Sequence, residues 1–290
     1  MTELPRITQE MINLYDEFTH KTNDRADFMR RLTELVGTSE AAQVIAAMIG
    51  ASMSAASIVP QNDSRIKSES VTFGDQMTGY LAWPANASGK LPAVMVVHEN
   101  RGLVPHIKDV VRRVALEGFL ALGPDFLAPL GGTPEDEDKG RDMIGKLEAP
   151  KVTAAAVDAV RFLKSHDKSN GKVGAIGFCW GGGVVNRTAV AAGSDLAAAV
   201  PYYGAQPKSE DVSKIKAEML MHYAGEDERI NAGIPAYKEA LGAAGVKHEI
   251  HQYPGSQHAF NNDTSEARYN KAAAEQAWSR TIAMLKRTLG

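Results

Sequence analysis

The sequence of 290 residues predicts an α/β protein whose mostly parallel sheet is covered by helices on both faces. Two observations support this fold class. From residue 70 onward, short apolar runs alternate with longer amphipathic stretches, which is the pattern of successive strand and helix units. The run PAVMVVHE at 92–99 is apolar along nearly its whole length. Such runs are typical of strands that are buried on both faces of a sheet.

The elements can be placed in order along the chain. VTFG and GYLAWP predict an antiparallel pair ahead of the strand at 92–99. The later elements are a helix with Val104, Ile107, Val110, Val111 and Val114, strand FLALGPDF, helix 151–165, strand KVGAIGF, a helix from 180, strands LAAAVPYYG and EMLMHYAG, helix 235–243, strand HEIHQYP, and a helix with Trp278, Ile282 and Leu285. The acidic, glycine-rich segment 131–142 is predicted to be a loop, at a position where lids occur.

Residues 1–60 are predicted to form a helical N-terminal extension, with the α/β domain at 61–290. Apolar residues recur there at helical spacing, and polar residues that cap helices separate the groups. The three faces comprise Met11, Leu14, Tyr15 and Phe18, then Phe28, Leu32, Leu35 and Val36 after a cap at Asn23 or Asp24, then Ala42, Ile45, Ala46 and Ile49 after a cap at Thr38 or Ser39. VPQNDSR at 59–65 is a polar linker. We expect the extension to cover the α/β domain or to form an oligomer contact. A homodimer is therefore one oligomeric state that the sequence allows.

Composition narrows the class of partner. The formal net charge is -3, and acidic and basic residues are interspersed, so there is no basic stripe for nucleic acid and no polybasic membrane anchor. We therefore expect a small-molecule partner. One cysteine cannot form an internal disulfide, which favours a cytoplasmic protein. The alternative is a degenerate export signal, with Arg30-Arg31 ahead of the apolar stretch 41–59 and its small residues SAAS at 54–57.

No cofactor motif or metal motif stands out in the sequence. GFCWGGG lacks both the G-K-[ST] ending of a P-loop and the G-x-G-x-x-G spacing of a dinucleotide fold. The eight histidines are scattered without the paired spacing of metal ligands. The sequence therefore predicts neither a cofactor nor a metal.

The stretch GAIGFCWGGG at 174–183 places Cys179 directly after a predicted strand. Its G-x-C-x-G pattern matches the G-x-S-x-G turn that carries the nucleophile of many hydrolases. Gly177 and Gly181 occupy the two positions that close packing reserves for glycine. The helix that follows would favour a thiolate through its N-terminal amides and dipole. The alternative is an inert buried thiol, since cysteine is often buried.

A nucleophilic thiol needs a base and an orienting acid, and on this fold they follow it in the order acid, then histidine. Asp227 lies in the loop after the strand EMLMHYAG, and His258 lies in the loop after HEIHQYP. Glu226 and Glu228 flank Asp227 and could replace it. His258 is favoured over His248 and His251, because those two alternate within a strand.

These motifs resemble the dienelactone hydrolase family of α/β-hydrolases, over roughly residues 70–288. The resemblance rests on HENRG, SNGKVGAIGFCWGGG, PYYG, GEDE and YPGSQHAFNND. It implies that Cys179 is the nucleophile, Asp227 the orienting acid and His258 the base. It also implies that Glu99, in HENRG, exchanges a proton with the cysteine. The alternative for Glu99 is a salt bridge with Arg101. The helical extension resembles that of longer bacterial members.

The resemblance also suggests the remaining parts of the site. The backbone N–H groups of Asn100 and Trp180 would form the oxyanion hole. Members that act on dienelactone grip the substrate carboxylate with two arginines. Asn262 stands in the place of one, and Arg141 is a candidate for the other. Trp180, Tyr203 and His98 could shape the pocket or simply pack in the core.

The sequence thus predicts a cysteine-dependent hydrolase of carboxylic esters or lactones that acts through a thioester. Two alternatives stay open. The same scaffold could cleave a thioester, peptide or phosphotriester bond, since a fold does not fix a substrate. The chain could also be a non-catalytic protein that binds a small molecule in the pocket.

Overall fold

A computed structural model describes residues 6–50 and 57–290 of the chain. One eight-stranded sheet organises the fold, with the strand order β1-β2-β4-β3-β5-β6-β7-β8. β2 pairs antiparallel with β1 and β4, and the strands from β4 to β8 run parallel. The strands are β1 (Ile66–Phe73), β2 (Met77–Pro84), β3 (Leu91–Val97), β4 (Leu120–Asp125), β5 (Ser169–Phe178), β6 (Ala198–Tyr202), β7 (Glu218–Ala224) and β8 (His248–Tyr253). This is the α/β-hydrolase arrangement.

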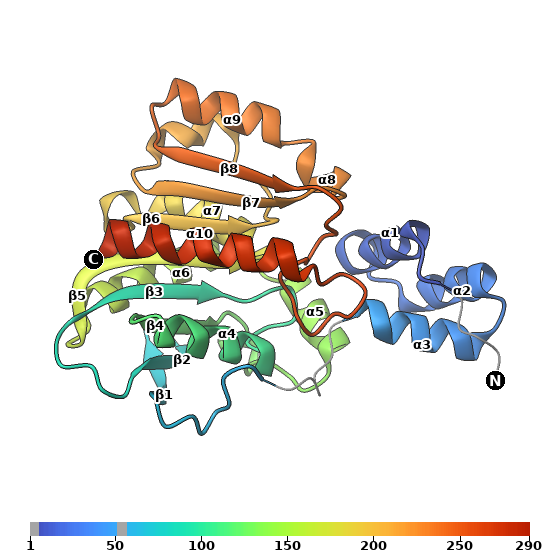
Figure 1. Ribbon diagram of the computed structural model, residues 1–290, viewed down its shortest axis with the longest axis horizontal. Coiled ribbons are helices and arrows are strands. Elements are labelled where there is room, and N and C mark those ends of the chain that lie inside the picture. Colours follow the sequence, from blue (N-terminus) through green and yellow to red (C-terminus); the bar gives the residue numbers. More distant parts are fainter. Residues whose placement is uncertain (1–5, 51–56) are drawn as a thin grey trace.

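Helices cover both faces of the sheet, as the sequence predicts (Figure 1). On one face, α4 and α10 bury apolar side chains against the central strands, and α6, α7 and α9 do so on the other. The helices are α1 (Gln9–Glu17), a π-helix (Phe18–Thr22), α2 (Arg25–Val36), α3 (Ser39–Ile49), α4 (Pro105–Leu116), α5 (Glu137–Gly145), α6 (Ala149–Ser165), α7 (Trp180–Ala191), α8 (Glu228–Asn231), α9 (Ile234–Ala243) and α10 (Lys271–Leu289).

The three N-terminal helices form their own small apolar cluster at the carboxyl ends of the strands. In Figure 1 the arrowheads of β3, β7 and β8 point toward them. Asp24 and Thr38 cap α2 and α3, each accepting a hydrogen bond from the amide three residues later. Leu35 is predicted to face inward but is 39% exposed, because each of these short helices buries only one stripe of its surface. The cluster contains Met11, Ile12, Leu14, Tyr15, Phe18, Phe28, Leu32, Ala42, Ile45 and Ile49.

Two segments differ from the sequence expectations. The first helix does not end regularly at Phe18 but continues as a turn of π-helix to Thr22. Such turns are rare and often occur at functional sites. The segment 131–142 is only partly a loop, because Asp136 caps α5 and residues from Glu137 onward are helical. Within the candidate export signal, positions 51–56 lie outside the described residues.

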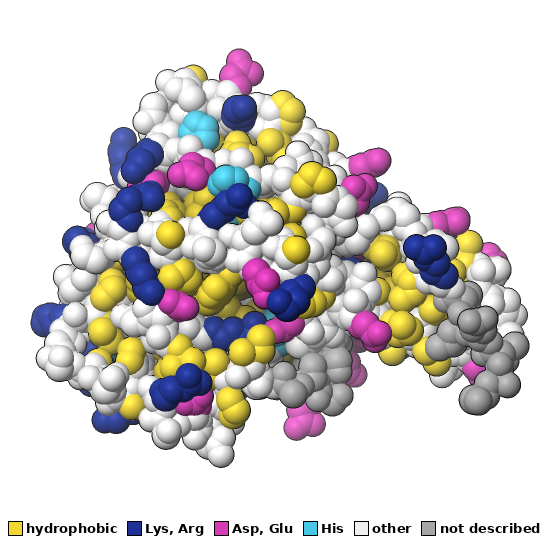
Figure 2. Space-filling view, in the orientation of Figure 1, with side chains coloured by type: hydrophobic (Ala, Val, Ile, Leu, Met, Phe, Trp, Pro, Cys, Tyr) yellow, Lys and Arg dark blue, Asp and Glu magenta, His cyan; other side chains and the backbone are white. Residues whose placement is uncertain are grey.

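Charges of both signs are interspersed over the face of the molecule seen in Figure 2. Among the described residues, no helix is both long enough and apolar enough to cross a membrane.

Candidate active site

Cys179 occupies a strained turn between β5 and α7. Its backbone has φ 54° and ψ -115°, a combination that residues with side chains rarely adopt. The neighbouring glycines make the turn possible. A Cβ at Gly177 would lie 2.3 Å from the carbonyl oxygen of Gly181, and a Cβ at Gly181 would lie 2.3 Å from that of His98. The chain therefore has the backbone of a nucleophile turn at the carboxyl end of a central strand.

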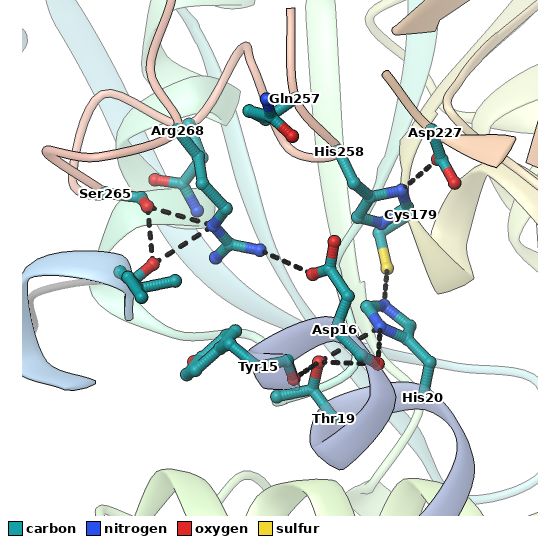
Figure 3. Close-up of polar contacts among 12 residues, drawn as sticks. Tyr15, Asp16, Thr19, His20, Cys179, Asp227, Gln257, His258, Ser265 and Arg268 are labelled. Carbon is teal, nitrogen blue, oxygen red and sulfur yellow. Dashed lines mark hydrogen bonds and ion pairs between the residues drawn. The ribbon is translucent and has the colours of Figure 1, made fainter. Parts of the chain in front are cut away.

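Asp227 and His258 meet beside this turn. Asp227 follows β7 and caps α8, accepting a hydrogen bond from the Ile230 amide at 3.2 Å. Nδ1 of His258, in the loop after β8, donates to Oδ2 of Asp227 at 2.5 Å (Figure 3). This leaves Nε2 of His258 buried and without a partner among the described residues. The side-chain nitrogen of His258 and Sγ of Cys179 lie within 4.8 Å of each other.

Once Cys179 is ionised, the charges in this group favour a proton on His258. Burial by itself lowers the pKa of His258, but an ionised Cys179 and the carboxylate of Asp227 outweigh it and raise the pKa to about 10. Burial raises the pKa of Asp227, and His258 more than offsets this, so the net shift is downward. The flanking residues Glu226 and Glu228 are exposed, and Asp227 is the carboxylate that bonds to the imidazole.

The N-terminal extension also reaches the thiol. Nε2 of His20, in the π-helix, lies 3.3 Å from Sγ of Cys179, and the rings of His20 and His258 meet edge to face with centroids 4.8 Å apart (Figure 3). His20 is not among the residues predicted for the site, because the N-terminal segment is predicted to be a helical cover of the α/β domain or an oligomer contact. The available signal was a lone histidine in the short polar stretch FTHKTND between two apolar helical faces.

Asn100 and Trp180, whose backbone amides are the predicted oxyanion donors, line the pocket together with Cys179. Within the described residues, neither the Asn100 N–H nor the Trp180 N–H has a hydrogen-bond partner. Asn100 follows β3 and Trp180 begins α7, so both amides lie at the carboxyl end of the sheet. Unpaired amides in these positions are able to bind a developing oxyanion.

Glu99 and Asn262 contact each other rather than the thiol. Nδ2 of Asn262 donates to Oε2 of Glu99 at 2.7 Å. Among the described contacts, Glu99 has no hydrogen bond with Cys179, so the proton exchange between them stays a prediction. The described contacts include no salt bridge between Glu99 and Arg101, whose guanidinium pairs with Glu137 at 2.6 Å, so this alternative also stays a prediction.

A pocket of about 460 Å³ opens beside Cys179, and its lining is cationic. The described residues that line it include four cations and no carboxylate. Lys21 and Arg229 are exposed, whereas Arg187 is partly buried and its Nε has no partner in the described part of the chain. Burial lowers the pKa of Arg187. The lining residues are Thr19, His20, Lys21, Asn23, Asn100, Arg141, Ile144, Gly145, Leu147, Cys179, Trp180, Gly183, Arg187, Tyr203, Ala205, Arg229 and Ile230.

Of the other residues predicted to shape the pocket, some line it and one packs in the core. Arg141 lines the pocket, but its guanidinium lies 4.2 Å from the Phe18 ring centre and forms an ion pair with Asp138 at 3.1 Å. Tyr203 is buried with a hydroxyl that has no partner among the described residues, and burial raises its pKa well above the ordinary value. His98 is fully buried and stacks on Trp180 at 5.3 Å, which is core packing.

Three of these side chains could hold a metal ion. The ligand atoms of His20, Cys179 and His258 all lie within 4.8 Å of one another, and zinc accepts such nitrogen and sulfur ligands. Motif spacing does not indicate this group, because its members are far apart in the chain. The same three side chains lie together at the nucleophile turn, where their nitrogen and sulfur atoms can also exchange protons.

The sequence model described as "Dienelactone hydrolase family" matches residues 77–289. An Escherichia coli K12 protein named "Putative carboxymethylenebutenolidase" is 34% identical over 73% of this chain and 83% of its own length. A Klebsiella pneumoniae structure described as a "Putative Dienelactone Hydrolase" has a TM-score of 0.68 at 30% identity, covering 76% of this chain and 98% of that one. A thermostable esterase from Pseudomonas putida shares the fold, with a TM-score of 0.64 at 17% identity over 100% of this chain and 99% of that one.

Proposed function

Because the chain belongs to the dienelactone hydrolase family, whose sequence model it matches from β2 to α10, we propose that it hydrolyses carboxylic esters or lactones through a thioester on Cys179. One observation carries the proposal. A strained turn presents the single cysteine beside the free Nε2 of a histidine whose Nδ1 is bonded to a buried carboxylate. This is the arrangement of a nucleophile, a general base and an orienting acid.

The reaction follows from these contacts. Nε2 of His258 takes the thiol proton, and the thiolate attacks the carbonyl carbon of the substrate. The carbonyl electron pair moves to oxygen, where the amides of Asn100 and Trp180 donate hydrogen bonds to it. When the tetrahedral intermediate collapses, the C–O bond to the alcohol breaks, and the alkoxide takes the proton from His258. The acyl group is now a thioester of Cys179.

Hydrolysis of the thioester regenerates the enzyme. His258 removes a proton from water, and the hydroxide adds to the thioester carbonyl. Collapse breaks the C–S bond, releases the carboxylic acid and returns the proton from His258 to sulfur. Asp227 holds the imidazole in the required tautomer and stabilises its charge in both steps.

The pocket lining supports an anionic substrate. Lys21, Arg141, Arg187 and Arg229 line it without a described carboxylate among them. A substrate carboxylate would offset the cost of burying the unpaired Nε of Arg187. We therefore propose an ester or lactone that carries a negative charge, even though Asn262 does not supply the expected cation.

A substrate panel tests the proposal and its alternatives. Activated carboxylic esters, lactones, a thioester, a peptide and a phosphotriester are compared with the Cys179→Ala variant as the background. We expect ester or lactone turnover that falls by about 10³-fold or more in the variant. Turnover confined to the other bonds would overturn the substrate assignment. Absence of turnover above background for every substrate would favour the alternative that the chain is a non-catalytic protein that binds a small molecule.

A further inference from the structure

His20 comes from a part of the chain that lies outside the family match at residues 77–289. The π-helix carries it into the pocket, where its Nε2 lies 3.3 Å from Sγ of Cys179. The extension is anchored on the loops that carry the proposed catalytic groups. Nδ2 of Asn100 donates to the Thr19 carbonyl at 3.2 Å, and Gln9 bonds to Gln257 at 2.9 Å, next to His258.

The hydrogen bonds around His20 identify which of its ring nitrogens carries the proton. Nδ1 lies 2.9 Å from the carbonyl oxygen of Asp16, which can only accept. It also lies 3.0 Å from Oγ1 of Thr19, whose single hydroxyl proton is donated to the Tyr15 carbonyl at 2.9 Å. Nδ1 therefore carries the proton, and a neutral His20 has a free lone pair on Nε2. The Cys179 thiol is the donor that faces this lone pair.

The charges that face His20 keep it neutral. Burial lowers the pKa of His20 most, and the positive charges of Arg229 and Arg268 lower it further, to well below its ordinary value, against the backbone bond to Asp16. The Asp16 carboxylate is itself paired with Arg268 at 3.4 Å. His20 can therefore accept a hydrogen bond from the thiol but does not compete with His258 for the proton.

We infer that His20 is a catalytic residue of the free enzyme, whose Nε2 accepts the Cys179 S–H hydrogen bond and keeps the nucleophile neutral until substrate enters. This rests on the proposed function, in which Cys179 attacks and His258 is the base. When the substrate carbonyl occupies the pocket, the thiol turns from His20 to Nε2 of His258. The S–H bond breaks, an N–H bond forms on His258, and Nε2 of His20 is left with its lone pair. The extension thus supplies the resting partner of the nucleophile.

Labelling of the single cysteine by iodoacetamide, without substrate, tests this role across a range of pH. His20→Phe keeps the bulk of the ring but has no acceptor, whereas His20→Gln retains an oxygen acceptor. We expect His20→Phe to be labelled about fivefold faster than wild type near neutral pH, the effect of losing one hydrogen bond. The difference should disappear as the pH is raised, because His20 can accept a hydrogen bond from sulfur only while sulfur carries a proton. His20→Gln should be labelled close to the wild-type rate, as should the matched control His248→Phe on β8.

Acceleration by the same factor at every pH would overturn the inference, because it would mean that His20 merely covers the thiol. An unchanged or slower rate in His20→Phe, or a rate in His20→Gln as fast as in His20→Phe, would also overturn it. Labelling requires no ester turnover, so the result is independent of the substrate panel. Failure of the proposed function appears instead as turnover that survives in Cys179→Ala.

Discussion

The side-chain amide of Asn262 donates a hydrogen bond to Oε2 of Glu99 at 2.7 Å. Oδ1 of Asn262 in turn accepts from the amide and hydroxyl of Thr264, at 3.0 and 2.6 Å. Among the described contacts, the Glu99 carboxylate thus has a hydrogen bond with Asn262 and none with Cys179. Asn262, which the resemblance places at the substrate, thus binds a neighbouring carboxylate instead. The described contact of the Cys179 thiol is with His20 of the N-terminal extension.

Replacing Glu99 with glutamine tests whether this carboxylate holds the resting thiol proton. Because Gln can still accept from Asn262, and because His20 is the acceptor for the thiol, we expect Glu99→Gln to label with iodoacetamide at close to the wild-type rate. A pH-dependent acceleration like that expected for His20→Phe would show that Glu99, and not His20, is the partner.

Arg187→Ala tests the charge preference of the pocket. Arg187 lines the pocket with an unpaired, buried Nε, so its loss removes an ionic hydrogen bond to an anionic substrate. We expect the ratio of kcat/KM for a carboxylate-bearing ester to that for a matched neutral ester to fall by about 10–100-fold. The control is Arg161→Ala, whose side chain on α6 is 64% exposed. An unchanged ratio in Arg187→Ala would exclude this arginine from substrate recognition.

The pH profile of Asp227→Asn tests the orienting acid. Cys179 and Asp227 raise the pKa of His258 to about 10, so the imidazolium of the ion pair keeps its proton until the pH rises through that value. Because this ion pair forms only once substrate is bound, we expect the alkaline limb of kcat in wild type near pH 10. In Asp227→Asn the limb should move to lower pH, and activity should fall by roughly 10³-fold or more.

The exposed neighbour Glu228 provides the control for this measurement. Glu228→Gln should keep both the rate and the alkaline limb of wild type, since Asp227 is the carboxylate at 2.5 Å from His258. If Glu228→Gln lost activity while Asp227→Asn kept it, the assignment of the acid would be wrong.

Gly177→Ala tests the packing of the turn. The added Cβ would lie 2.3 Å from the Gly181 carbonyl oxygen and 2.7 Å from a Val185 methyl, so the strand and helix must separate. We expect the free energy of unfolding to fall by at least about 2 kcal/mol in denaturant titrations. Gly145→Ala is the matched control, because a Cβ there meets no atom within 4 Å. Its stability should stay within about 0.5 kcal/mol of wild type, and equal losses in both variants would contradict the packing argument.

The sequence predicts most of the sheet because local signals specify its strands. Continuous apolar runs indicate central strands, and the glycines around Cys179 are required by close backbone packing. Chain order also points to Asp227 and His258, since loops after parallel strands share one edge of the sheet. His20 could not be predicted in the same way. Its position depends on how a separate helical cluster docks on distant loops, and its π-helical turn leaves no periodic signal.

The central claim is that Cys179 carries the acyl group, and mass spectrometry of the intact protein under rapid quenching tests it most directly. Wild type mixed with an activated ester should gain the mass of one acyl group, mapped to the peptide that contains Cys179, and then lose it as turnover proceeds. His258→Ala should accumulate little of this species, and Cys179→Ala none. Full turnover with no adduct on Cys179 at any time, or turnover that persists in Cys179→Ala, would contradict the account.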